Sequence, residues 1–178
     1  GLGLAVTAAT ALAALALVPG GLKVVSPAQL DVLLAAIHRE QPGSIRGTAA
    51  DVLSKARLSP AQLIELSSHL PTAGLLELDR LLAPFAQSAD EAAGLALVAA
   101  LAAPELQSAV TVESLKQRLA KYGPLVQAEA DKLYVSIDAE HAHQSERLHA
   151  ALESLPAGDI RRGQEIFNST RVSCRSSS

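Results

Sequence analysis

The feature that most constrains the fold is a four-residue string, Ser-Pro-Ala-Gln, that occurs twice in the chain. It stands at residues 26–29 and again 33 positions later, at 59–62. The serine hydroxyl can cap a helix, the proline suits the first helical turn because its missing N–H is not needed there, and the glutamine can reach back to the cap. Each string therefore predicts the start of a helix. The spacing between the two strings lies in the range of helical-repeat proteins.

Apolar residues at helical spacing follow each of these starts. The first helix has a stripe of Leu30, Leu33, Leu34 and Ile37, and the second has Leu63, Leu66 and Leu70. A partner helix is predicted after each proline-containing turn. The partner stripes are Ile45, Ala49, Val52 and Ala56 after Pro42-Gly43, and Leu75, Leu78, Leu82 and Phe85 after Pro71-Thr72. The pattern predicts a helix-turn-helix unit that is repeated.

A third unit is predicted to begin with Ser88 and Glu91 as a capping box. Its first helix, residues 92–102, is apolar nearly all round, so it must be covered on several sides, and Pro104 ends it. Its partner has a core face of Val112, Leu115 and Leu119. Three stacked pairs resemble HEAT-like repeats in period, and they are about the minimum for an array with a continuous core.

Composition supports an all-α fold. The chain has 178 residues, enough for one domain or a short array of repeats. Hydrophobic residues make up 49% of it and aromatic residues only 2%, so leucine and alanine must form the core, which favours packed helices over sheets. The net charge is −3 and the charges are spread along the chain. No strong field points to nucleic acid or to an anionic membrane, and we expect neither as a partner.

Residues 124–155 predict a longer helical segment. Its stripe consists of Val126, Ala130, Leu133 and Ile137 and resumes at Leu148, Leu152 and Leu155, with His141 and Gln144 in between. One interpretation is a continuous helix whose middle crosses solvent. The other is a break near Asp138, whose carboxylate could cap a restart. Because no Gly or Pro intervenes, the continuous helix is favoured.

The first 18 residues carry no charge, which raises the possibility of a signal peptide or a membrane span. They lack a basic n-region, and they hold alanine and threonine where a strong span would hold leucine and isoleucine. We therefore expect a buried, alanine-rich helix that ends at Pro19-Gly20-Gly21, and no membrane span.

The titratable residues do not form a predicted catalytic or metal site. His141, His143 and His149 do not share a helix face at their spacing, so a solvated face is favoured over a metal site. His38 and His69 stand at predicted helix ends, where an imidazole can serve the last carbonyls.

The acidic residues are interpreted in the same structural way. Asp90 and Glu91 are interpreted as charge at a helix N-terminus, and four others, Asp51, Glu65, Glu77 and Asp79, as scattered over solvent faces. No phosphate-binding loop, nucleophile elbow or zinc-protease motif is present in the sequence. We therefore do not expect this chain alone to be an enzyme.

The C-terminal stretch carries a more specific signal. Gly158-Asp159 begins it, Arg162-Gly163 and Ile166-Phe167 follow at helical spacing, and Cys174 comes a few residues later. This order resembles the first helix and haem-attachment loop of a c-type cytochrome. In that family the loop is Cys-x-x-Cys-His, with two thioether-forming cysteines and an axial histidine.

The resemblance makes Cys174 the first haem thioether position of an incomplete site. The same register continues Arg175-Ser176-Ser177-Ser178, so the second thiol and the histidine are absent, and the chain contains no methionine to serve as a sixth ligand. We expect no cofactor bound by this chain as written, because a serine hydroxyl forms no thioether. Either the end is a degenerate or misread part of a longer reading frame, which we favour, or the domain has lost its haem. Without the resemblance, Cys174 would be an unpaired thiol in a basic, serine-rich tail.

Three segments extend the resemblance to a family. The chain resembles planctomycete-type haem-binding Cys-x-x-Cys-His proteins from about Pro42 onward. The segments that carry this resemblance are residues 58–63, 70–74 and 155–159, and the last of them leads into residues 162–170. The resemblance implies a large periplasmic or otherwise extracytoplasmic parent, in which a sugar-dehydrogenase-like β-propeller precedes a HEAT-like region and a C-terminal cytochrome c domain that carries haem c. Residues 1–156 would then be the HEAT-like α-solenoid, with a long helix at its end. Residues 157–178 would be the truncated N-terminal part of the cytochrome c-like domain.

Two functions follow as expectations. Under the resemblance, the chain is the helical spacer of a c-type cytochrome-containing oxidoreductase, and its partners are the upstream propeller and the downstream cytochrome domain of a haem-dependent dehydrogenase. The competing hypothesis is a helical-repeat scaffold for protein–protein interaction with no redox role. A contiguous exposed apolar groove would favour the scaffold.

Overall fold

The computed structural model describes residues 12, 14–15 and 22–154, and this part of the chain is all-α. Apart from helices, turns and bends, the described residues contain only an isolated bridge between His38 and Ala73. Contacts divide the chain into two compact units, residues 1–141 and 142–178. In the described residues no helix is both long and apolar enough to cross a membrane. Most of the expected helix over residues 1–18 lies outside the described residues, although Leu12 is buried in the core.

The two repeated strings form the predicted helix starts. Helix α2 spans Pro27–Ala36 and helix α4 spans Pro60–His69. At the first, Ser26 Oγ accepts the Gln29 N–H at 3.3 Å and Gln29 Oε1 accepts the Ser26 N–H at 2.9 Å. The same reciprocal pair forms at the second, at 3.4 and 3.0 Å. Both capping boxes are therefore confirmed, and so is the first partner helix, α3, at Gly43–Lys55.

The second partner helix is broken into short pieces, which the apolar stripe did not predict. The segment consists of η1 Leu70–Thr72, η2 Leu75–Glu77, α5 Leu78–Leu82 and η3 Ala83–Gln87, where η marks a 3-10 helix. Prolines lie within both η1 and η3, and a proline has no N–H for the helical ladder. Leu75 is 45% exposed, so the predicted core face begins only at Leu78.

In the third helix pair, the N-cap of the first helix lies two residues after the predicted cap, Ser88. Helix α6 spans Glu91–Leu101, and its N-cap is Asp90, whose Oδ1 accepts the Ala93 N–H at 2.9 Å. Ser88 instead accepts the N–H of Asp90 at 3.1 Å, so the predicted Ser88–Glu91 capping box is wrong. Asp90 stands directly before the first helical residue, and a carboxylate there also complements the positive end of the helix dipole.

Two further helices, the short α7 and the partner helix α8, follow α6. Pro104 does not simply end α6, because it begins the short helix α7, Pro104–Gln107. Helix α8 then spans Val112–Leu119, with Thr111 as its N-cap.

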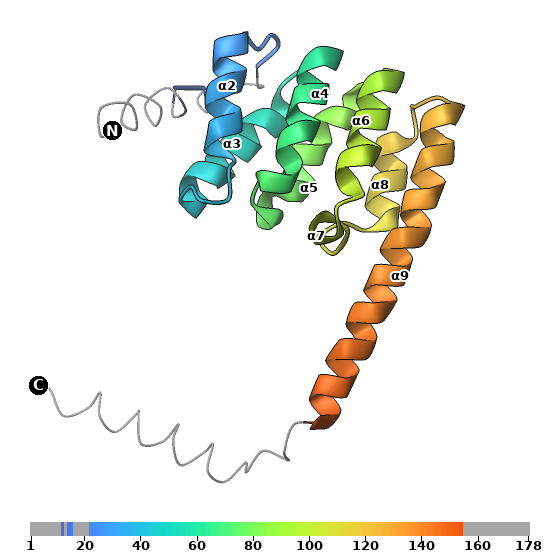
Figure 1. Cartoon of the computed structure of the whole chain (residues 1–178). Helices are drawn as coiled ribbons and strands as arrows, with labels where there is room; N and C mark the ends of the chain where they lie inside the picture. The colour runs from blue at the N-terminus through green and yellow to red at the C-terminus, as the bar shows by residue number, and fades with distance from the viewer. Residues whose placement is uncertain (1–11, 13, 16–21, 155–178) are drawn as a thin grey trace, which may run out of the picture. The chain divides into compact units, whose positions relative to one another are not determined.

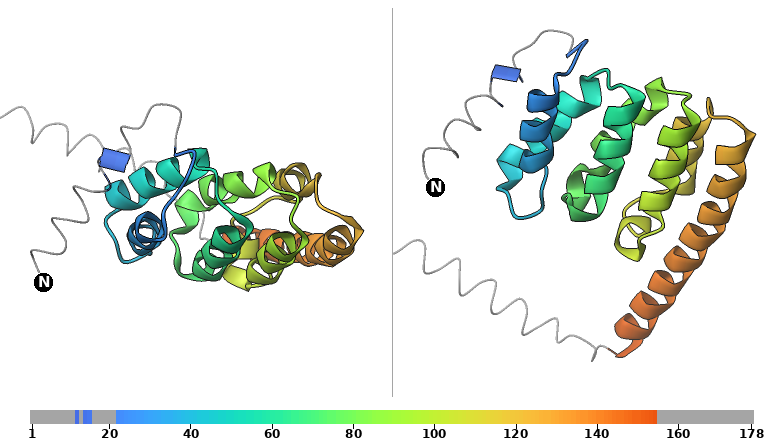
Figure 2. Two further views of the ribbon diagram at one scale, coloured as in Figure 1. Left: turned by 90° about the horizontal axis from the view of Figure 1, so that it is seen from above. Right: turned by 45° about the horizontal axis from the view of Figure 1, so that its top comes forward.

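The helices of residues 22–141 lie in two layers. Helices α2, α4 and α6 lie side by side, with α3, α5 and α8 behind them (Figures 1 and 2). The core between the layers is mostly leucine and alanine, and Phe85 is its largest fully buried side chain. Helix α6 also lies close to the start of α9, because a Cβ atom at Gly94 would stand 2.9 Å from Val126 Cγ1.

Helix α9 spans Pro124–Ser154 without a break, so the continuous interpretation of this segment is confirmed. Val126, Ala130 and Ile137 on its first half are fully buried. Residues 142–153 are all exposed, including Leu148 at 62% and Leu152 at 56%. The apolar stripe of the sequence is therefore a buried face only as far as Ile137 within the described part of the helix.

Candidate functional site

The predicted haem-attachment position, Cys174, lies outside the described residues, as does the whole cytochrome-like segment 157–178. The candidate sites that the structure defines therefore come from residues 22–154.

The three clustered histidines of α9 have separate surroundings. His141 is half-buried, and its Nε2 lies 3.2 Å from the Gln107 carbonyl oxygen, so it joins α9 to α7. His149 lies 3.7 Å from Glu153 one turn along the exposed part of the helix, and His143 is exposed. Within the described residues, no group of three or more His, Cys, Asp or Glu side chains could hold a metal ion.

The other two histidines line a pocket of about 390 Å³ between α2 and α4, together with Asp31 and Glu65. His69 is the last residue of α4, and its Nδ1 lies 3.0 Å from the Glu65 carbonyl oxygen, in agreement with the predicted role at a helix end. His38 behaves differently from the prediction. Its Nδ1 accepts the Glu40 N–H at 3.4 Å, beyond the end of α2, so it stabilises the following turn rather than the last helix carbonyls.

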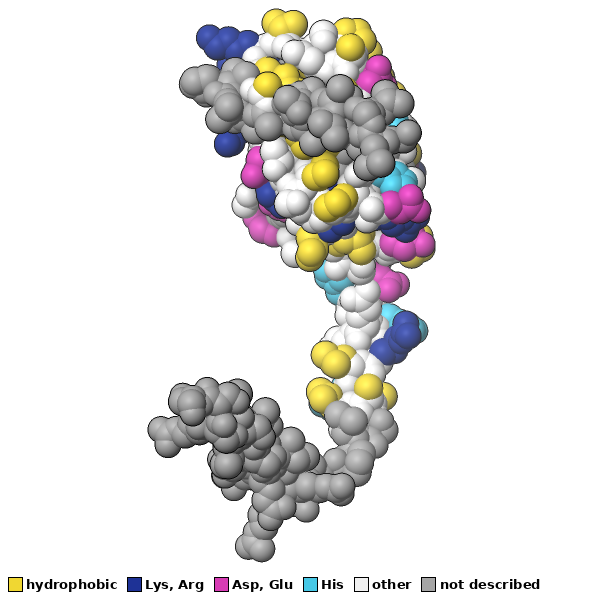
Figure 3. Space-filling model, turned by 90° about the vertical axis from the view of Figure 1, so that its left-hand side faces the viewer, with side chains coloured by type: hydrophobic (Ala, Val, Ile, Leu, Met, Phe, Trp, Pro, Cys, Tyr) yellow, Lys and Arg dark blue, Asp and Glu magenta, His cyan; other side chains and the backbone are white. Residues whose placement is uncertain are grey.

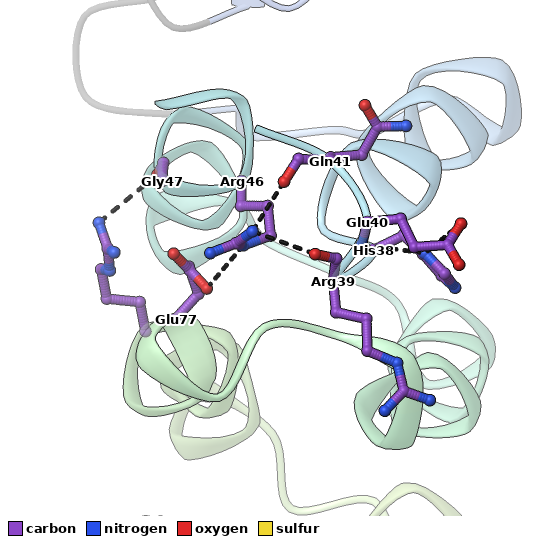
Figure 4. A network of polar contacts seen from close by, with 8 residues as sticks. His38, Arg39, Glu40, Gln41, Arg46, Gly47 and Glu77 are labelled. Carbon is purple, nitrogen blue, oxygen red and sulfur yellow. Dashed lines mark hydrogen bonds and ion pairs between the residues drawn. The ribbon is translucent and has the colours of Figure 1, made fainter. Parts of the chain in front are cut away.

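A buried ion pair links α3 to η2. Arg46 Nε lies 3.2 Å from Glu77 Oε2, and Arg46 Nη1 donates to the carbonyl oxygens of Arg39 at 3.2 Å and Gln41 at 2.7 Å (Figure 4). The interpretation of Glu77 as a solvent-face residue is therefore wrong, since its side chain is only 5% exposed. The sequence offers no local signal for this pair, because its two members are 31 positions apart.

Gly74 is what allows this ion pair to pack against the backbone. A Cβ atom there would stand 2.6 Å from Arg46 Nε and closer still to Glu77 Oε2. The φ angle of Gly74 is −71°, which any residue can adopt, so the requirement for glycine is one of space.

Two more ion pairs connect consecutive helices of the second layer. Arg80 Nη1 lies 2.7 Å from Asp51 Oδ1 and joins α5 to α3. Arg118 Nη2 lies 2.7 Å from Asp79 Oδ1 and 2.8 Å from the Asp79 carbonyl oxygen, joining α8 to α5. Asp51 and Asp79 are exposed, as predicted, but each has a partner on the next helix. With Arg46–Glu77, these pairs link α3, η2, α5 and α8 in succession, and we call them the ion-pair ladder.

Two buried tyrosines flank the contact between α8, α9 and η3. The Tyr122 hydroxyl donates to the Phe85 carbonyl oxygen at 2.9 Å, whereas the Tyr134 hydroxyl finds no hydrogen-bond partner among the described residues. Lys116 Nζ lies 5.5 Å from the centroid of the Tyr134 ring. Burial raises the pKa of both phenols above its ordinary value, and the nearby carboxylates of Asp90 and Asp131 add to the increase for Tyr122 and Tyr134, respectively.

An apolar groove of about 480 Å³ runs between α6 and α9. Its walls are mostly aliphatic, with Leu95, Val98, Ala99 and Ala102 from α6 and Leu133 from α9. Polar residues at its border include Glu129 and Lys132, which pair with each other at 2.6 Å. With its mostly aliphatic walls, this groove offers shape and hydrophobic contact rather than reactive groups.

One face of the molecule is drawn with its side chains coloured by type in Figure 3. On the face drawn in Figure 3, acidic and basic side chains are interspersed. No protein-family model matches the sequence, and no curated protein and no solved structure matches it significantly.

Proposed function

We propose that this chain is a helical spacer in a c-type cytochrome-containing oxidoreductase, and that it positions a haem domain for electron transfer. The observation that carries the proposal is the second half of α9. Residues 142–153 continue the helix with every side chain exposed, directly before the segment that resembles the first helix of a cytochrome c domain. At 1.5 Å per residue, this exposed helix extends the chain by about 18 Å.

The packed part of the chain suits the same role. Its helix pairs are proposed to form a HEAT-like α-solenoid, and the ion-pair ladder would fix the register of successive pairs. A spacer must keep its shape, and cross-helix pairs that are partly buried favour one packing arrangement over others. The family resemblance assigns the chemistry of the parent to other modules, the upstream propeller and the cytochrome c domain.

The remaining features of the proposal come from the family resemblance. The parent would be a periplasmic or otherwise extracytoplasmic haem-dependent dehydrogenase, with a β-propeller upstream and the rest of the cytochrome c domain downstream. Haem c would belong to that domain, and Cys174 would supply its first thioether once a second cysteine and an axial histidine are present.

The test begins with the coding DNA from the Thr170 codon onward. We expect a frame that encodes Cys and His in the register of residues 177 and 178 and continues to a methionine ligand. The corrected longer chain, expressed with cytochrome-maturation machinery, should show a Soret band that survives denaturation, and the matched Cys174→Ser variant should lose most of it. A confirmed Ser-Ser followed by a stop codon would overturn the proposal. A Soret band of this kind in the chain as written would overturn the separate expectation that this chain binds no haem.

A second candidate function is supported by the α6–α9 groove. A helical-repeat scaffold binds partners through exposed apolar surface, and the groove is a contiguous surface of that kind. This function requires no haem. It predicts that variants of the groove lose a partner while their helical fold is unchanged.

A further inference from the structure

Helix α6 is apolar on a side that the described part of the chain leaves uncovered. Its sequence from Ala92 to Leu101 carries no charge, and Leu95, Ala92 and Ala99 on it are exposed. Leu95 is 36% exposed at the edge of the α6–α9 groove. An exposed apolar helix face beside an apolar groove is typical of a surface that packs against another protein.

The charges around the groove favour a second copy of this chain as the occupant. In a two-fold interface the same patch meets itself, so a patch with one sign of charge would repel its copy. Here the border carries one acidic and one basic side chain, Glu129 and Lys132, a single turn apart on α9. A two-fold axis can therefore set Lys132 of one copy near Glu129 of the other. Leu95, the side chain next to the groove, can at the same time enter the groove of the second copy.

We propose that the α6–α9 groove is the interface of a two-fold homodimer, with Leu95 of each copy inserted between α6 and α9 of the other. The dimer needs neither haem nor residues 157–178. It therefore stands independently of the proposed spacer function, and it gives the groove of the second candidate function a specific occupant.

The first test is sedimentation equilibrium of the full chain over a range of concentrations. We expect a monomer–dimer equilibrium, and Leu95→Glu should weaken it at least about a hundredfold, because a buried leucine is lost and a carboxylate would be desolvated at two symmetric places. The matched control is Ile64→Glu on α4, since Ile64 is 39% exposed and does not line the groove. The control should dimerise normally, and both variants should keep the helical circular dichroism of the parent chain.

The second test asks whether Glu129 and Lys132 meet across the interface. Glu129→Lys and Lys132→Glu should each weaken the homodimer, because each creates a patch of one sign. A mixture of the two variants should form a heterodimer more tightly than either forms a homodimer, which a purely intramolecular pair would not produce. A chain that stays monomeric at all concentrations overturns the proposal. Normal dimerisation of Leu95→Glu, or no gain on mixing, overturns it as well.

Discussion

Arg46 and Glu77 form a buried ion pair, with Arg46 Nε 3.2 Å from Glu77 Oε2 and side-chain exposures of 18% and 5%. The guanidinium also donates to two carbonyl oxygens of the turn between α2 and α3. One side chain thus connects the turn, α3 and η2. The hydrogen bonds matter because a buried pair is favourable only when its remaining donors and acceptors are satisfied.

Replacing one member of this ion pair should lower the free energy of unfolding far more than replacing both members. Arg46→Met should lower the free energy of unfolding by about 3–5 kcal/mol, because it leaves the Glu77 carboxylate buried without a partner. The double variant Arg46→Met/Glu77→Leu should recover much of that loss. Urea denaturation followed by circular dichroism measures both. Asp51→Ala is the control, since its pair with Arg80 is largely exposed and should contribute less than about 1 kcal/mol. Equal losses in Arg46→Met and Asp51→Ala would contradict this account.

Two glycines should respond to alanine with opposite signs. Gly74→Ala should destabilise the fold by about 1–3 kcal/mol, because the new methyl group would overlap the Arg46–Glu77 pair. Gly47→Ala should stabilise it by about 0.5–1 kcal/mol, because Gly47 lies inside α3 and its nearest neighbour for a new Cβ, on Arg80, is 4.0 Å away. Thermal unfolding of the two variants measures both changes. A stabilising Gly74→Ala would show that the ion pair is not packed against this backbone.

Removal of the hydroxyl group should change the free energy of unfolding differently at the two buried tyrosines. Tyr122→Phe should cost about 0.5–1.5 kcal/mol, because it removes a buried hydrogen bond to the Phe85 carbonyl oxygen, which keeps the Ser88 N–H as its other donor. Tyr134→Phe should be nearly neutral or stabilising, because its hydroxyl has no partner within the described residues. Chemical denaturation at pH 7 distinguishes the two. Similar losses would mean that the Tyr134 hydroxyl has a partner of equal strength.

The same tyrosines should make the fold sensitive to alkaline pH. Burial raises the pKa of both phenols above 10.0, so the folded state binds their protons more tightly than the unfolded state does. Their contribution to stability is fully present below pH 10 and is lost as the pH rises through the raised pKa values. The double variant Tyr122→Phe/Tyr134→Phe should therefore show a shallower fall in unfolding free energy above pH 10 than the parent chain. An unchanged slope would assign the alkaline loss to other groups.

Local sequence signals predicted the helices well where the deciding contacts are also local. The capping boxes at Ser26 and Ser59 need only residues three apart, and both form. The periodic stripe and the absence of Gly or Pro likewise predicted the unbroken α9. The error at Ser88 is of the same local kind, because Asp90 offered an equally good acceptor one position before the helix.

The contacts that join the helices could not be predicted in this way. Glu77 lacks a local partner in the sequence, and its burial depends on Arg46 and on the space left by Gly74. Leu148 and Leu152 continue the apolar period of α9, yet they are exposed, because periodicity shows which residues share a face and not whether another element covers it. The α6–α9 groove could not be predicted from the sequence either, because periodicity does not show which faces stay uncovered. The haem-attachment prediction at Cys174 stays a prediction.

The exposed half of α9 should open more readily than its buried half. Isolated helices of about a dozen residues are marginal in water, but residues 142–153 extend a helix that packing has already nucleated. Amide hydrogen exchange should therefore be slowest near residues 126–137, where opening requires loss of the core, and should become progressively faster toward residue 153. Mass spectrometry of overlapping peptides from α9 measures this gradient. Uniform slow exchange along the helix would mean that another surface covers residues 142–153 in solution.

A matched pair of substitutions separates the two halves of the helix. Ala150→Gly should speed exchange in residues 145–153 by roughly fivefold, as expected for a propensity loss of about 1 kcal/mol, and should leave the global free energy of unfolding unchanged, because Ala150 is exposed. Ala130→Gly, at a fully buried position of the same helix, should lower the global free energy of unfolding by about 1–2 kcal/mol, because it adds a small cavity to the same propensity loss. If Ala150→Gly destabilised the whole fold as much as Ala130→Gly, residues 142–153 would be part of the cooperative core, and the spacer role would lose its main support.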